Sequence, residues 1–388
     1  MKKILYVTGS RAEYGIMKRL LLRLANEDNI QLSIIATGMH CDERYGHTYK
    51  FIENDGFTID KLIDINISNN SNADILYTMA RCQSEFAAYF RESEIDALII
   101  LGDRYEIFSV AIAAAMHCLP IIHLHGGEKT LGNYDEFIRH SITKMSSLHL
   151  ASTEEYRKRI IQLGEDPKTV FNIGSLGAEN AALMKLPTKE ELEYKYGALS
   201  KPYFVIVFHP ETLNPVSPDV QVDSLLMALD KIKDKYDFIF IGANADTGAN
   251  KIQERIESFC KKNNSRLLTS ILPEDYLALN KYSNGIVGNS SSGLIEVPTL
   301  GVPTINIGDR QKGRVRGASV FDCPCEAESI YQAIKESQNY SYSGVDVGNI
   351  NPYLKKGTLE RAVYIIKDFL NNNVRARGKD FYDIEFYC

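Results

Sequence analysis

The stretch ALIILGDRYEIFSVAIAAAMHCLPIIHL, residues 97–124, contains the pattern that decides the fold. Residues 97–101 form an uninterrupted apolar run, residues 106–116 have helical periodicity, and residues 120–124 form a second apolar run. Short runs of Ile, Val and Leu without alternation are typical of parallel strands that are buried on both faces. The order strand, helix, strand therefore predicts two parallel strands connected by a helix.

The same pattern recurs along the rest of the chain. In the first half it predicts a helix at Arg11–Ala25 and further strands at Ile4–Val7, Leu32–Ala36, Leu148–Ala151 and Val170–Ile173. In the second half it predicts strands at Phe204–Phe208, Phe238–Ile241, Arg266–Leu268, Gly285–Val287 and Pro303–Ile307. Strands that alternate with helices in two blocks predict an α/β protein with two Rossmann-like, doubly wound domains and a cleft between them.

The domain limits follow from the charged segment between the two blocks. Residues 186–202 contain Pro187 and Pro202 and are interpreted as a boundary segment with a short helix. The N-terminal domain is then 1–185 and the C-terminal domain 203–358. Residues 359–388 are predicted to form an amphipathic helix and a tail that packs back on the N-terminal domain.

Composition narrows the class of protein. The 388 residues carry a net charge of −6, which argues against a nucleic-acid binder because such proteins need an excess of cations. The seven Cys are scattered and contain no CxxC pair, so reduced thiols are expected, without a disulfide framework or a zinc site. The apolar residues 107–125 are interrupted by polar residues and Pro120, so no membrane insertion and a cytoplasmic location are expected.

Polar clusters follow the predicted strands of the first half, where ligands of parallel sheets bind. Thr8-Gly9-Ser10-Arg11 opens a helix and is interpreted as an anion site or as a strand–helix turn with a solvated Arg11. Asp103 comes just after the strand at 97–101. It is interpreted either as an acid at the entrance of the cleft or as the N-cap of the following helix.

The densest cluster spans residues 123–140. His123 and His125 are expected to face one side of a strand end, and a Gly-Gly turn then brings Glu128. The segment continues to Asp135, Glu136, Arg139 and His140. A metal site is disfavoured because no recognised ligand spacing is present. Carboxylates and imidazoles in one cleft favour general acid–base chemistry instead, with polar loop residues as the alternative.

The second half has clusters of another kind. His209 and Asn244 follow two of its strands. Ser290, Ser291 and Ser292 lie between glycines and open a helix that contains Glu296, a pattern that favours diphosphate and ribose binding over a flexible loop. The segment 308–317 is strongly basic and is either a solvated loop or a partner of the diphosphate; its cations are Arg310, Lys312, Arg314 and Arg316.

Taken together, these motifs resemble a known family. The motifs GSRAEYG, TGMH (Thr37–His40), LGDRYE, HGGEKT, YDEFIRHSITK, NIGSLGAEN, FHPET, GNSSSGLIEVP and GDRQKGRVRG occur in the order and spacing of the hydrolysing UDP-N-acetylglucosamine 2-epimerases. The chain is most similar to the branch that serves bacterial sialic-acid capsule synthesis. The resemblance implies a GT-B fold, conversion of UDP-N-acetylglucosamine and water into N-acetylmannosamine and UDP, no cofactor, and a homodimer or homotetramer. It also implies elimination of UDP to a 2-acetamidoglucal, followed by hydration with inversion at C2.

The resemblance assigns roles to individual residues. It implies that the catalytic residues are Asp103, His125, Glu128, Asp135, Glu136, Arg139 and His209. It implies that substrate and UDP are bound by Arg11, His40, Gly174, His209, Asn244, Ser290, Ser291, Ser292, Glu296, Arg310 and Arg314. Many relatives have His-x-Glu-Gly-Gly where this chain has His123-Leu124-His125-Gly126-Gly127, so the C2 base is either His125 or Glu128.

Two further functions are compatible with the same motifs. One is a hydrolysing 2-epimerase that acts on a UDP-2,4-diacetamido sugar, because a few loop contacts decide sugar specificity. The other is a GT-B glycosyltransferase or a UDP-sugar sensor that does not turn its ligand over.

Overall fold

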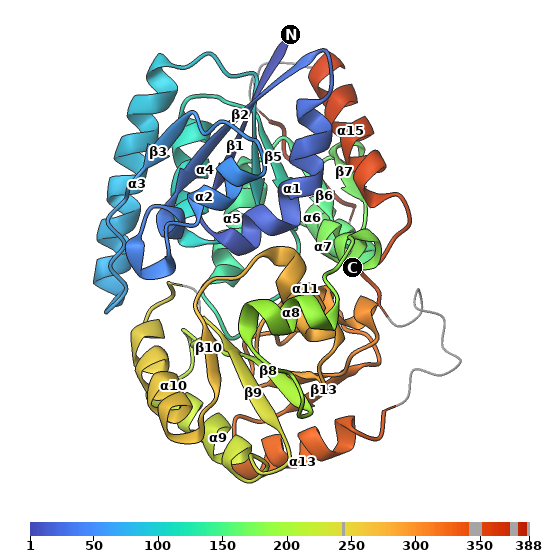
Figure 1. Cartoon of the computed structure of the whole chain (residues 1–388). Coiled ribbons are helices and arrows are strands. Elements are labelled where there is room, and N and C mark those ends of the chain that lie inside the picture. The colour runs from blue at the N-terminus through green and yellow to red at the C-terminus, as the bar shows by residue number, and fades with distance from the viewer. Residues whose placement is uncertain (243–244, 341–350, 373–378, 386–388) are drawn as a thin grey trace.

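The computed structural model describes residues 1–242, 245–340, 351–372 and 379–385 and contains two parallel sheets, one above the other in Figure 1. The first sheet has seven strands in the order β3-β2-β1-β4-β5-β6-β7. Its strands are β1 (Lys2–Thr8), β2 (Ile30–Thr37), β3 (Lys61–Ile63), β4 (Ala97–Leu101), β5 (Ile121–Leu124), β6 (Leu148–Ala151) and β7 (Val170–Asn172).

The second sheet repeats this winding with six strands in the order β10-β9-β8-β11-β12-β13. Its strands are β8 (Tyr203–Val207), β9 (Asp237–Ile241), β10 (Arg266–Leu268), β11 (Ile286–Gly288), β12 (Thr304–Ile307) and β13 (Val320–Cys323). The strand order reverses beside β1 in one sheet and beside β8 in the other, which are the points where doubly wound sheets bind ligands. The prediction of two doubly wound units is confirmed.

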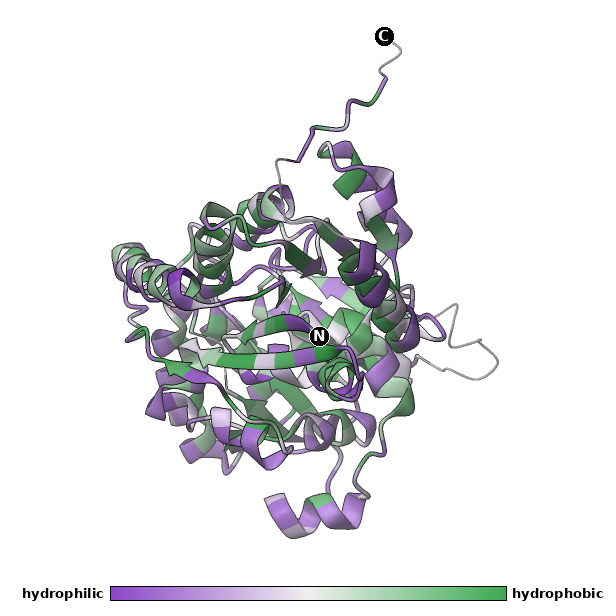
Figure 2. Cartoon of the chain, turned by 90° about the horizontal axis from the view of Figure 1, so that it is seen from above, coloured by the Kyte–Doolittle hydropathy of each residue, from purple (hydrophilic) through white to green (hydrophobic). Residues whose placement is uncertain are grey.

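Helices cover both faces of each sheet, and each face has its own apolar cluster. Figure 2 shows many polar residues on the outer helices and apolar residues on the strands. The helices of the first unit are α1 (Arg11–Ala25), α2 (Tyr49–Asn54), α3 (Asn72–Glu92), α4 (Tyr105–Met116), α5 (Asp135–Met145), α6 (Glu154–Gln162) and α7 (Leu176–Leu183). Those of the second are α8 (Lys189–Tyr196), α9 (Pro218–Asp230), α10 (Ala249–Asn263), α11 (Pro273–Lys281), α12 (Ser292–Ile295) and α13 (Ala327–Ser337). Short 3₁₀ helices are η1 (Gly38–His40), η2 (Glu43–Tyr45), η3 (Pro167–Thr169) and η4 (Val297–Leu300).

Each apolar run identified in the sequence forms a strand, but β3 and β13 were not predicted. Both are short edge strands, and each is only partly buried. An edge strand pairs on one side only and needs no continuous apolar run, so the pattern that identified the central strands is absent there.

The last helix, α15 (Thr358–Asn372), packs on the first sheet although it follows the second unit in sequence. Its residues Ala362, Val363 and Ile366 lie in one apolar cluster with Leu20 of α1 and Ile4 of β1. By contrast, α8 contributes Leu192 to the core of the second unit. The chain therefore crosses twice between the units, while the domain limits 1–185, 186–202, 203–358 and 359–388 stay predictions. Within the described part of the chain, no helix has the length and apolar character needed to span a membrane.

Candidate active site

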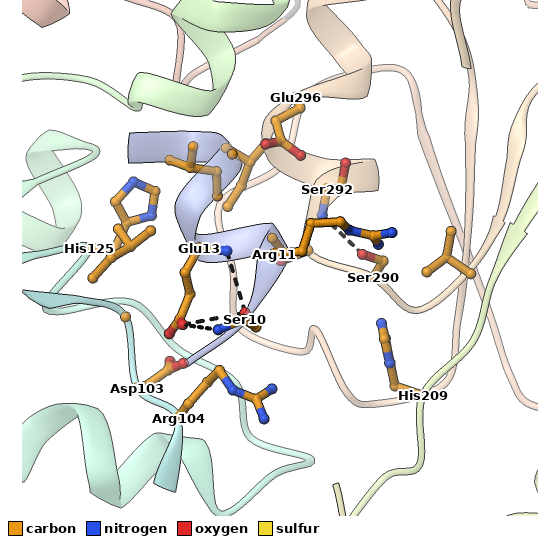
Figure 3. A pocket seen from close by; sticks show the side chains of 18 of the residues that line it. Ser10, Arg11, Glu13, Asp103, Arg104, His125, His209, Ser290, Ser292 and Glu296 are labelled. Carbon is orange, nitrogen blue, oxygen red and sulfur yellow. Dashed lines mark hydrogen bonds between the residues drawn. The ribbon is translucent and has the colours of Figure 1, made fainter. Parts of the chain in front are cut away.

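A cavity lies between the two units at the carboxyl ends of their strands (Figure 3). Many residues expected from the sequence line it: Arg11, Asp103, His125, Glu128, Asp135, His209, Ser290, Ser291, Ser292, Glu296, Arg310 and Arg314. Figure 3 shows Asp103, Arg104 and His125 on one side and Ser290, Ser292 and His209 on the other. Asn244 lies outside the described residues.

Asp103 lies just beyond the carboxyl end of β4 and is held there by a buried arginine. The Arg139 Nε donates to Asp103 Oδ2 over 2.7 Å, and the Arg139 side chain is fully buried. The same guanidinium donates to Thr130 Oγ1 (2.6 Å) and to the Glu128 carbonyl oxygen (2.7 Å). Asp103 makes no N-cap hydrogen bond to α4, whose N-cap is Arg104, so the alternative role as a helix cap is wrong.

Glu136 and Arg139, which the resemblance implied to be catalytic, do not line the cavity. Glu136 Oε2 accepts from Arg139 Nη1 (3.0 Å) and from the Thr130 backbone N–H (2.5 Å). The acid and the arginine lie one helical turn apart on α5, so the helix brings both to the loop that starts at Glu128. Their position suits them to hold this loop and Asp103 in place.

Asp135 lines the cavity and has an environment unlike that of Asp103. Burial raises the pKa of Asp135 to about 7, and the nearby carboxylates of Asp103 and Asp246 add to the effect. Asn133 Nδ2 donates to Asp135 Oδ2 over 3.1 Å. A carboxyl group that keeps its proton near neutral pH can act as a general acid.

His125 pairs with Glu128, and His123 and His125 do not face the same side as expected. β5 ends at Leu124 and His125 has φ +64°, so the alternation of side chains stops there. His123 therefore lies inside, with its Nε2 2.8 Å from the Gly102 carbonyl oxygen, and does not line the cavity. His125 does line it, with Nδ1 3.2 Å from Glu128 Oε1, while its Nε2 has no hydrogen-bond partner among the described residues.

Glu128 is held in its ionised form from three sides. Burial opposes ionisation, but the Arg314 guanidinium and His125 outweigh it and hold the pKa of Glu128 at about 2. Arg314 Nη1 lies 2.6 Å from Glu128 Oε2, and Ser152 Oγ donates to Glu128 Oε1 over 2.9 Å. A carboxylate with such a low pKa is a weak base, so it is better suited to orienting His125 than to taking a proton itself.

The serine loop of the second unit approaches the end of β8 closely. Gly288, at φ +146°, leads into it, and a Cβ there would lie 1.9 Å from the Val207 carbonyl oxygen. Only glycine fits this approach. The Ser292 backbone N–H donates to Ser290 Oγ over 3.4 Å. Burial raises the pKa of Glu296, which follows α12. The loop thus presents hydroxyl groups and a helix start to the cavity.

Arginines of both units face this loop. The Arg310 Nη1 donates to the Asn289 carbonyl oxygen (3.2 Å), and its backbone N–H donates to Glu211 Oε1 (3.2 Å). Arg11, in the first turn of α1, donates through Nη1 to Ser270 Oγ over 3.4 Å. Positive charge from two units at one cavity favours a phosphate-bearing ligand.

The other cations of the basic segment lie at the surface. Lys312 pairs with Asp309 (3.1 Å) and Arg316 pairs with Asp322. The alternative of a solvated basic loop therefore describes these two residues, whereas Arg310 and Arg314 line the cavity.

His209 is anchored through its backbone. The Asn289 side chain accepts from the His209 N–H (2.7 Å) and donates to the His209 carbonyl oxygen (2.8 Å). Burial, together with the charges of Arg310 and Arg104, moves the pKa of His209 well below its usual value. The imidazole is therefore neutral and can serve as a hydrogen-bonding group beside the cations.

His40 and Gly174, which were predicted to bind the substrate, do not line the cavity. His40 is fully buried, with its ring nitrogens 3.1 Å from Thr8 Oγ1 and 2.8 Å from Thr48 Oγ1. Gly174 packs against Thr358 and Lys355, where the chain enters α15.

Several cavity residues were not predicted from the sequence, notably Glu13, Arg104 and Asp246. Glu13 completes a capping box with Ser10, and the spacing Ser-x-x-Glu was a readable signal for it. Asp246 lies between arginines of both units, 3.8 Å from Arg104 Nη1 and 3.5 Å from Arg310 Nη2. No local sequence pattern predicts that Asp246 pairs with these two arginines. Among the described residues, no cluster of His, Cys, Asp or Glu has the arrangement of a metal site.

We expect the variant D135N to be more stable than the wild type at pH 8 and equally stable at pH 4. An Asp in the unfolded chain has a pKa near ~3.9, so the raised pKa of Asp135 lets the native state bind a proton more tightly than the unfolded state. This contribution is present at low pH and is lost as the pH rises toward about 7. Asn imitates the protonated acid, so the melting temperature should rise on the order of 2–4 °C at pH 8.

Thermal unfolding at both pH values measures this difference. Asp309 provides the control, because it is an exposed aspartate on the other side of the cleft region, paired with Lys312. D309N should have little effect at either pH. An equal stabilisation by D135N at pH 4 and pH 8 would contradict the expected protonation of Asp135.

Comparison with known proteins fits this geometry. The sequence model of the family described as UDP-N-acetylglucosamine 2-epimerase matches residues 22–367. The chain is 60% identical to the polysialic acid biosynthesis protein P7 of Escherichia coli, over 99% of this chain and 98% of that protein. It is 40% identical to the GDP/UDP-N,N'-diacetylbacillosamine 2-epimerase (hydrolyzing) of Campylobacter jejuni, over 88% of each chain.

A solved structure supports the fold. The co-structure of MnaA from S. aureus with UDP has a TM-score of 0.76 at 18% identity and covers 96% of this chain and 97% of that one. The likeness confirms the predicted GT-B arrangement of two Rossmann-like units. With the family model and the relatives covering nearly its whole length, the chain belongs to the UDP-N-acetylglucosamine 2-epimerase family.

Proposed function

We propose that this protein is a hydrolysing 2-epimerase that converts UDP-N-acetylglucosamine and water into N-acetylmannosamine and UDP, an early step of sialic acid biosynthesis. One observation carries the proposal: arginines and the serine loop line the same cavity as Asp103, Asp135 and the His125–Glu128 pair. The first set suits a nucleoside diphosphate and the second suits proton transfer on the sugar. The names of the E. coli and C. jejuni relatives support the pathway and the hydrolysing reaction.

In the first step, the C2–H bond and the bond from C1 to the diphosphate oxygen break, and a C1=C2 double bond forms. UDP leaves with the bonding electrons and carries the negative charge. Arg310, Arg11 and the serine loop are placed to stabilise that charge. The UDP-binding roles of Ser290, Ser291, Ser292 and Glu296 belong to this proposal.

His125 is our candidate for the C2 base. Its Nδ1 faces the ionised Glu128, so a proton on Nδ1 is stabilised and Nε2 is left to accept one. Nε2 has no other hydrogen-bond partner within the described structure. Of the two candidates, His125 and Glu128, we therefore propose the imidazole as the base and Glu128 as its orienting partner.

In the second step, water adds to the double bond: its oxygen binds C1, and a proton reaches C2 on the face opposite to the one that lost it. Asp135 is a suitable donor because its raised pKa keeps a proton on it near neutral pH. Asp103, held by Arg139, is suited to orient or deprotonate the water. Substrate and water supply every atom of the products, so this scheme requires no redox cofactor.

The product formed in deuterated water tests the proposal. We expect UDP and free N-acetylmannosamine that carries one deuterium at C2, because the new C2–H bond takes its hydrogen from solvent. Product without deuterium at C2 would exclude the elimination route. UDP that stays attached to the sugar would indicate a non-hydrolysing epimerase, and UDP release only with an added acceptor would indicate a glycosyltransferase.

A UDP-2,4-diacetamido sugar is a second candidate substrate, favoured by the name of the C. jejuni relative. Rates of UDP release from the two sugars decide between them, and the sugar with the higher kcat/KM is the substrate. A cytoplasmic location and a homodimer or homotetramer stay predictions.

A further inference from the structure

Two buried tyrosines hold the backbone of Val315, the residue that follows Arg314 in the basic segment. The Val315 N–H donates to the Tyr156 hydroxyl over 2.8 Å, and the Tyr353 hydroxyl donates to the Val315 carbonyl oxygen over 2.7 Å. The two hydroxyl oxygens lie 2.8 Å apart. Both tyrosine side chains are fully buried. Neither tyrosine was predicted from the sequence to have a role.

These contacts leave one arrangement of protons. The single hydroxyl proton of Tyr353 is used on the Val315 carbonyl oxygen, so the contact between the hydroxyls must use the proton of Tyr156. Burial raises the pKa of Tyr156 to about 12, and burial also moves the pKa of Tyr353 well above its usual value, so both groups stay protonated. The result is a closed ring of three hydrogen bonds, called here the tyrosine ring, which consists of Tyr156, Tyr353 and the Val315 backbone.

The tyrosine ring connects separate parts of the fold. Tyr156 lies on α6 of the first unit, and Val315 lies in the loop after β12 of the second. Tyr353 belongs to the segment through which the chain returns to the first unit, and its carbonyl oxygen accepts from the Ser175 N–H (2.9 Å). The three partners therefore have fixed positions only when both units and the return segment are in place.

Tyr156 also lies against the turn that carries Glu128. A Cβ added to Gly127 would lie 2.4 Å from the Tyr156 carbonyl oxygen, so this glycine is required where the turn meets α6. Arg159, on the same helix, donates to the Gly127 carbonyl oxygen. One helix thus supports Glu128 from its own unit and, through Val315, the neighbouring Arg314 from the other.

We infer that Tyr156 and Tyr353 are positioning residues, which set Arg314 against Glu128 by holding Val315. The ion pair that results, 2.6 Å from Arg314 Nη1 to Glu128 Oε2, is the contact that keeps Glu128 ionised beside His125. The effect on turnover rests on the proposed function, because it requires the His125–Glu128 pair to act on the substrate. The effect on geometry does not depend on it.

The variants Y156F and Y353F each remove one hydroxyl group and leave the aromatic ring in place. We expect kcat to fall by about ten- to a hundredfold in both, since small displacements of catalytic partners have effects of this size. Y203F is the matched control: Tyr203 is also buried and donates to a backbone carbonyl oxygen, that of Leu279 (2.8 Å), but it does not line the cavity. Y203F should lower the melting temperature by a similar amount and leave kcat unchanged.

A double-variant test separates positioning from general loss of structure. In the background R314M, adding Y353F should reduce kcat no further, because the residue that the tyrosine ring positions is already absent. A full additional loss would overturn the inference, as would wild-type kcat in Y353F and Y156F. An equal loss in Y203F would overturn it as well.

Crystal structures of Y353F and Y203F give a readout that needs no activity. The distance from the Arg314 guanidinium to the Glu128 carboxylate should exceed about 4 Å, the limit for an ion pair, in Y353F and stay short in Y203F. If the wild-type protein releases no UDP from UDP-N-acetylglucosamine, the proposed function fails while this comparison still decides the inference. An intact ion pair in Y353F would overturn it.

Discussion

Replacement of Asp103 by Asn is expected to lower kcat by about a thousandfold while UDP still binds. Asn cannot take a proton, and its amide cannot serve as the anionic partner of Arg139, whose Nε donates to Asp103 Oδ2 over 2.7 Å. The serine loop and Arg310 belong to the second unit and do not depend on this carboxylate. Release of N-acetylmannosamine measures kcat, and titration calorimetry with UDP measures the dissociation constant.

Asp96, at the opposite end of β4, offers a matched control. It precedes β4 at the amino end, whereas Asp103 follows β4 at the carboxyl end, and its Oδ2 accepts from the Lys3 N–H over 2.8 Å. D96N therefore makes the same chemical change away from the cavity and should keep wild-type kcat. A D103N variant that turns over at the wild-type rate would remove Asp103 from the mechanism, and one that loses UDP binding would assign it to the ligand site instead.

How well the sequence predicts this protein depends on whether a feature is local. Central strands such as Ala97–Leu101 are buried on both faces, so their composition alone marks them. Because parallel strands end at one edge of a sheet, the sequence alone is enough to place the acid and serine clusters that follow them at one cleft. The edge strand Lys61–Ile63 is mostly exposed and lacks this apolar composition, so it was missed.

Ion pairs between side chains of the two units join residues that are far apart in the sequence, so no local sequence pattern predicts them. Arg314 and Arg316 are two residues apart in an irregular loop, yet one reaches Glu128 and the other a surface aspartate. No periodicity applies to such a loop, so their directions depend on the packing of both units. His125 is a similar case, because its positive φ turns it away from the side that strand alternation predicts.

The largest effect on stability is expected from R139M. Arg139 is fully buried and satisfies Asp103, Glu136, Thr130 and the Glu128 carbonyl oxygen at once. Its loss leaves two carboxylates without their cation in a partly buried site, which should lower the free energy of unfolding by about 3–5 kcal/mol. Urea unfolding measures this change. R316M, which breaks an ion pair at the surface, should cost less than about 1 kcal/mol.

The role of Arg139 can be tested by the coupling between the stability effects of R139M and D103N. In the background D103N, the further change R139M should cost less than it does in the wild type, because one of the orphaned charges is already gone. R139K should recover part of the stability but little of kcat. An ammonium group carries the charge but lacks the planar set of N–H donors with which the guanidinium binds Asp103, Glu136 and Thr130 at once. Additive losses in the double variant would mean that Arg139 stabilises α5 independently of Asp103. In that case the arginine would not be the residue that holds the acid at the mouth of β4.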